Sequence, residues 1–97
     1  MIVGVCKIDV ILGAHNSLKE KRKVLRKIKD STFSKFKVPV SEVGHQDLWQ
    51  RAELGFAVVG NDKQDLNSII DKMADYIFDL SAGQIVDRKY EFIYFNG

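Results

Sequence analysis

Basic side chains gather on one side of the helix expected to begin near residue 17. Helical spacing of about 100° per residue brings together Lys19, Arg22, Lys23 and Arg26. Cations near a helix N-terminus, where the helix dipole also attracts anions, are suited to binding phosphate. They are mildly unfavourable for the first turn itself, which suggests that they serve a function. We therefore predict contacts to RNA phosphates, with a merely solvated helix face as the alternative.

The segment 45–51 holds the other concentration of polar and aromatic side chains. We predict that polar and stacking contacts to RNA come from its members His45, Gln46, Trp49 and Arg51. Two interpretations of the tryptophan remain open. It either folds back over the end of a sheet or is offered to a partner.

Catalysis and metal binding are alternatives for the same segment. Asp47 near His45 would permit an acid–base pair, as a hydrolase needs, although the chain offers no suitably spaced nucleophile beside it. A metal ion would require His15, His45 and Asp47 to converge at roughly 2.0 to 2.2 Å from one point. The sequence contains no phosphate-binding loop and no dinucleotide-binding motif. We predict no catalytic residue, no metal ligand and no cofactor.

Hydrophobic periodicity predicts the elements that must position these groups. Alternation at residues 2–12 predicts a strand with Cys6 facing the core, and the helix that follows is capped by Ser17 and ends near residue 36. Pro39 makes the segment 38–43 an edge strand. The remaining elements are a strand at 51–60, a helix from Asp62 ended by Gly83, and a strand at 86–95. Lys21 lies near the apolar side of the first helix, where we expect it to snorkel over the sheet edge rather than make a specific contact.

The order β-α-β-β-α-β predicts an α+β, ferredoxin-like sandwich. Its antiparallel sheet has strand order 4-1-3-2, and both helices cover one face. In this topology the start of the first helix and the loop 45–50 lie at the same end of the sheet. That end is the candidate site.

Composition and charge bound the possible classes of protein. With 97 residues, of which 45% are hydrophobic and 29% charged, the chain forms one domain, residues 1–97. Residues 1–37 carry a net charge of +7 and the remainder −5. The acidic second helix is therefore a possible internal partner for the basic one. No stretch approaches the roughly 18 apolar residues of a membrane span, and a signal peptide is absent, so we expect a cytoplasmic protein without membrane contact.

The uncovered face of the sheet suggests a second class of function. It lacks the aromatic side chains on which RNA-recognition motifs stack bases. It offers instead an apolar patch comprising Val3, Val5, Ala57 and Val59. Such a patch favours self-association, so a homodimer is the alternative prediction.

Three segments of the chain resemble the bacterial YlxP-like family, a domain of unknown function. They are residues 17–22 (Ser-Leu-Lys-Glu-Lys-Arg), 43–51 (Val-Gly-His-Gln-Asp-Leu-Trp-Gln-Arg) and 55–61 (Gly-Phe-Ala-Val-Val-Gly-Asn). The resemblance covers nearly the whole chain and implies a small ferredoxin-like fold. It also implies genes beside those for translation initiation and ribosome maturation, hence a role near RNA or the ribosome. The family's usual acidic residue before the loop histidine is replaced here by Gly44.

Overall fold

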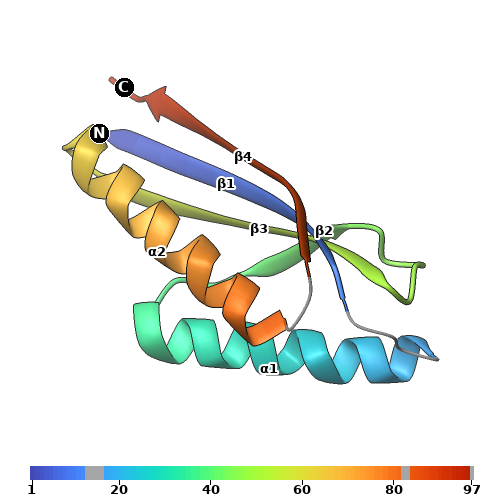
Figure 1. Cartoon of the computed structure of the whole chain (residues 1–97). Coiled ribbons are helices and arrows are strands. Elements are labelled where there is room, and N and C mark those ends of the chain that lie inside the picture. The colour runs from blue at the N-terminus through green and yellow to red at the C-terminus, as the bar shows by residue number, and fades with distance from the viewer. Residues whose placement is uncertain (13–16, 82–83, 97) are drawn as a thin grey trace.

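The computed structural model describes residues 1–12, 17–81 and 84–96. The predicted order of elements is confirmed (Figure 1). The elements are β1 (Ile2–Ile11), α1 (Leu18–Phe36), β2 (Ser41–Gly44), β3 (Arg51–Gly60), α2 (Lys63–Ser81) and β4 (Gln84–Tyr94). The predictions made for His15 and Gly83 fall outside the described residues.

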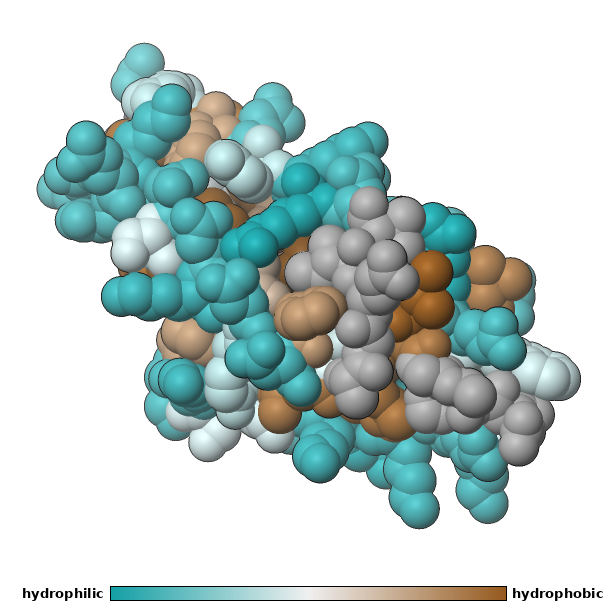
Figure 2. Space-filling model, viewed as in Figure 1, coloured by the Kyte–Doolittle hydropathy of each residue, from teal (hydrophilic) through white to brown (hydrophobic). Residues whose placement is uncertain are grey.

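The four strands form one antiparallel sheet in the order β2-β3-β1-β4, which is the predicted order. Both helices lie on one face of this sheet, and β1 and β3 occupy its centre (Figure 1). The fold is therefore the ferredoxin-like α+β sandwich that the element order predicts. Hydrophilic side chains dominate the face shown in Figure 2, which is viewed as in Figure 1.

Alternation along β1 and β3 builds the core. Cys6, Ile8 and Val10 of β1 point toward the helices and are buried. The matching buried set comprises Ala52, Leu54, Phe56 and Val58 from β3, Leu25 and Ile28 from α1, and Leu66, Ile70, Met73 and Ile77 from α2. Burial raises the pKa of the Cys6 thiol to about 11, so this side chain is the inert core residue expected from its position.

The boundaries of α1 follow from its terminal residues. The Ser17 hydroxyl accepts a hydrogen bond from the Glu20 N–H at 3.2 Å, as predicted for an N-cap. At the other end Lys37 adopts a left-handed backbone, φ 60°, and its N–H donates to the Phe33 carbonyl at 2.7 Å. Pro39 lies before β2 rather than within it, so the edge strand begins later than predicted and is short.

None of the described helices is both long enough and apolar enough to cross a membrane.

Candidate functional site

The loop between β2 and β3, residues 45–50, is held against both the end of β1 and the start of α1. The Leu12 N–H donates to the Gln50 carbonyl at 2.8 Å. The Lys21 ammonium donates to the His45 carbonyl at 2.6 Å. These two bonds confirm that the loop and the first turns of α1 lie at one end of the sheet, as the topology predicts.

Lys21 overturns the expectation of a snorkelling side chain. It is only 1% exposed, and its Nζ lies 2.8 Å from Oε2 of Glu42 on β2. The prediction was wrong because Glu42 of β2 directs its carboxylate, and His45 of the following loop its carbonyl, toward the side of α1 that faces the sheet. A signal was available, since Val40 and Glu42 are two residues apart and therefore share the inward side of an extended segment.

His45 faces two carboxylates from the central strands. Its Nε2 lies 3.6 Å from Asp9 Oδ2 and 3.7 Å from Glu53 Oε2. Its backbone is left-handed, φ 58°, which turns its carbonyl toward Lys21. Gly44 makes room for this arrangement, because a Cβ there would lie 2.9 Å from the Glu53 Oε1.

Asp9 and Arg51 form an ion pair with two hydrogen bonds. The Arg51 Nε and Nη2 donate to the two oxygens of Asp9 at 3.0 and 2.9 Å. This hydrogen bonding holds the pKa of Asp9 below its usual range and raises that of Arg51. Arg51 was predicted as an RNA contact, yet in this structure two of its nitrogen atoms are occupied by Asp9.

The open face of the sheet carries three carboxylates in one row, because the register sets Glu53 opposite Asp9 and Asp9 opposite Asp87. Like charges directly opposite one another repel. Neighbouring cations offset this repulsion: besides Arg51, Lys7 lies 3.6 Å from Glu53, and Lys89 lies 3.6 Å from Asp87.

The same region contains a possible set of metal ligands. Atoms of Asp9, His45 and Glu53 lie within 4.8 Å of one another. Arg51 already binds both oxygens of Asp9, and Lys7 lies beside Glu53. Sequence reasoning missed Asp9 and Glu53 as the carboxylates that face His45. The available signal was their alternation onto the open face of their strands, but the register that sets them opposite one another comes only from the structure.

The basic face of α1 keeps its cations available. Lys19, Arg22, Lys23 and Arg26 are exposed. Within the described part of the chain none of them forms an ion pair with α2, whose Asp71 and Asp75 instead pair with Arg88 of β4 at 3.3 and 3.1 Å. The predicted alternative, in which the acidic helix neutralises the basic one, is therefore not what the described residues do.

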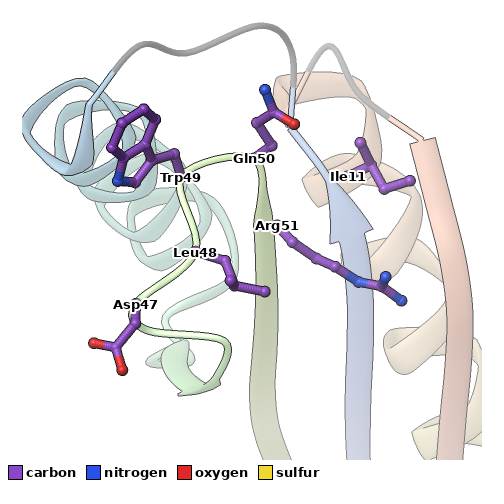
Figure 3. A pocket seen from close by; sticks show the side chains of 6 residues that line it. All are labelled: Ile11, Asp47, Leu48, Trp49, Gln50 and Arg51. Atoms are coloured by element: carbon purple, nitrogen blue, oxygen red, sulfur yellow. The ribbon is translucent and has the colours of Figure 1, made fainter.

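Trp49 projects from the loop and is 50% exposed, so it is not buried over the end of the sheet. It borders an open pocket of about 540 Å³. The pocket is lined by Ile11, Asp47, Leu48, Trp49, Gln50 and Arg51 (Figure 3). Gln46 is exposed on the same loop but lies outside this lining.

The fold and site define a small ferredoxin-like α+β protein with a basic helix beside an aromatic loop. Residues 3–90 match the family model described as "Protein of unknown function (DUF503)", and the chain belongs to this family. The uncharacterized protein YlxP of Bacillus subtilis (strain 168) is 34% identical over 76 residues, which cover 78% of this chain and 83% of that protein. The resemblance to the YlxP-like family is thereby confirmed.

Similarity to solved structures concerns the fold alone. The structural genomics protein YJCS has a TM-score of 0.51 at 9% identity, covering 92% of this chain and 96% of its own. The cofactor-independent oxygenase SnoaB from Streptomyces nogalater has a TM-score of 0.47 at 8% identity, covering 99% and 94%. A dimeric ferredoxin-like protein from an uncultured marine organism has a TM-score of 0.44 at 15% identity, covering 95% and 86%.

Proposed function

We propose that this protein is a non-enzymatic RNA-binding module that works near the ribosome in the bacterial cytoplasm. The supporting observation is the group of four exposed cations on α1, which form no ion pair with α2 among the described residues. The hydrogen bond from the Lys21 ammonium to the His45 carbonyl joins their helix to the loop on which Trp49 is exposed. Cations and an exposed aromatic side chain on adjoining elements are the combination that RNA-binding surfaces use.

The parts of the surface have different roles. Lys19, Arg22, Lys23 and Arg26 contact phosphates, and His45, Gln46 and Trp49 lie along the adjoining loop. Arg51 is not a phosphate ligand in this proposal, because its Nε and Nη2 already donate to Asp9.

Salt dependence of RNA binding tests the proposal. Four phosphate contacts release enough counterions to give a log–log slope of about −3, so affinity should fall roughly 60-fold from about 50 to about 200 mM KCl. An RNA hairpin with an unpaired loop, titrated by fluorescence anisotropy, provides the measurement. Affinity that does not change with salt would contradict the proposal.

A charge-reversal pair locates the surface. The double variant Arg22→Glu and Lys23→Glu should weaken binding about tenfold or more, because it replaces two phosphate contacts with repulsion. The matched control is Lys63→Glu with Lys72→Glu, which makes the same change in net charge on exposed residues of α2. Equal losses in the two variants would show that only net charge matters and would contradict a defined site.

A second candidate function is self-association through the open face of the sheet. The register aligns Val59, Val3 and Ile93 in one row across three strands. Val59 is 63% exposed and Ile93 47% exposed. An apolar row of this kind on a sheet without a covering layer favours a homodimer.

Light scattering after size-exclusion chromatography tests the homodimer. We expect the mass of a dimer for the unaltered chain, and that of a monomer for Val59→Asp, which places a charge in the apolar row. Ser68→Asp, on an exposed position of α2, is the control and should remain dimeric. A monomeric mass for the unaltered chain at high concentration would reject this candidate.

A further inference from the structure

The walls of the pocket beside Trp49 include apolar side chains that are exposed to solvent. Ile11 and Leu48, which help to line it, are 40% and 47% exposed. Figure 3 shows Leu48 and Trp49 coming from the loop, and Ile11 and Arg51 from the adjoining strands β1 and β3. Concave surfaces with apolar walls and a few polar groups are typical of sites that enclose part of a ligand.

One of the lining groups is aromatic and suited to stacking. Trp49 is 50% exposed, and its indole offers a flat surface. Nucleobases stack on aromatic rings of this kind. The guanidinium of Arg51 instead extends over β1, away from Trp49 (Figure 3), where it donates two hydrogen bonds to Asp9.

Polar groups of the pocket can bind the edge of a base. The Gln50 amide both donates and accepts hydrogen bonds, and the Asp47 carboxylate accepts them. A base within a double helix would not reach these groups, because its edge is paired and its faces are covered by its neighbours. The volume of about 540 Å³ suits one or two small planar groups rather than a duplex.

Charge on the adjoining helix identifies the class of ligand. The loop that carries Trp49 is attached to α1 through the bond from Lys21 to the His45 carbonyl. The exposed cations Arg22 and Lys23 follow Lys21 directly in the sequence. We propose that the pocket receives an unpaired base of single-stranded RNA, stacked on Trp49, while the phosphates of the same strand contact the first turns of α1. This inference rests on the proposed RNA binding and specifies its substrate class.

Intrinsic fluorescence provides a direct test, because Trp49 is the only tryptophan of the chain. We expect a single-stranded oligoribonucleotide of about eight residues, long enough to reach both pocket and helix, to quench this fluorescence at the concentrations at which anisotropy reports binding. The same sequence annealed to its complement should bind through α1 without quenching. An abasic strand of equal length, which keeps the phosphates, should likewise leave the fluorescence unchanged.

Variants separate stacking from structural damage. Trp49→Ala should weaken binding of the single strand about tenfold and leave duplex binding unchanged, since only an unpaired base can stack on the indole. Trp49→Phe should retain most of the affinity. Tyr94→Ala, an exposed aromatic residue at the far end of the sheet, is the control and should behave like the unaltered protein.

The outcomes distinguish the two proposals. Salt-dependent RNA binding with equal affinity for single strand and duplex, and with unchanged fluorescence, would overturn the base pocket and leave the proposed function in place. Quenching by the abasic strand as strong as by RNA would also overturn the base pocket. No binding of any RNA by anisotropy would reject both.

Discussion

Lys21 places an ammonium group where water hardly reaches it, with a side chain only 2% exposed. Removal of such a group from water costs several kcal/mol, and attraction to Glu42 at 2.8 Å offsets this cost. Among the described residues no hydrogen bond reaches the buried Oε2 atom of Glu42. The positive charge of Lys21 is therefore what compensates for the burial of this carboxylate oxygen. The pair therefore adds little net stability but fixes α1 relative to β2 and the loop.

Removing Lys21 alone should be strongly destabilising. We expect Lys21→Met to lower the free energy of unfolding by about 3 kcal/mol, because it leaves the Glu42 carboxylate without its counter-charge. The double variant Lys21→Met with Glu42→Leu should recover most of the loss. Urea denaturation measures both.

Lys19→Met is the matched control, because Lys19 is exposed on the same helix. It should change stability by less than about 0.5 kcal/mol. A double variant no more stable than Lys21→Met would show that the ion pair is not the cause of the loss.

The end of α1 illustrates what an element needs from its terminal residue. Lys37 has a left-handed backbone that a residue with a Cβ adopts at a cost, and glycine is the usual choice there. We expect Lys37→Gly to raise the free energy of unfolding by roughly 0.5 to 1 kcal/mol, measured by urea denaturation.

The same substitution within α1 should act in the opposite direction. Lys27→Gly changes an exposed residue in the middle of the helix and should lower stability by roughly 0.5 to 1 kcal/mol, because glycine is a poor helix former. A loss of stability in Lys37→Gly would contradict the backbone argument, since both variants remove one exposed lysine.

The helices and strands could be predicted from local sequence patterns, but the residues at which they begin and end were harder to predict. The alternation of Cys6, Ile8 and Val10 and the cap at Ser17 depend only on residues close together in the sequence. Both predictions are confirmed. The edge strand β2 was placed too early, because Pro39 identifies an edge but not the point where pairing starts. The residue at which β2 begins to pair is set by β3, which lies outside the sequence around Pro39.

At the scale of the whole molecule, the fold followed from the order of elements, but the polar site did not. The contacts among Asp9, His45, Glu53 and Arg51 join three segments whose alignment is set by sheet register. A pattern of period two gives the face of each residue but not the residue opposite it. For the same reason the sequence favoured Asp47, only two residues away, as the partner of His45, whereas the structure places Asp9 beside it.

The pairing of β1 with β4 has a consequence for the order in which the molecule folds. The Phe95 N–H bonds the Met1 carbonyl at 2.8 Å, and the Met1 amino group donates to the Phe95 carbonyl at 3.2 Å, across 94 positions of sequence (Figure 1). Contacts so distant along the chain form late, because closing a long loop costs entropy before any contact compensates for it. During synthesis β1 emerges before β4, so one edge of this central strand stays unpaired until β4 arrives.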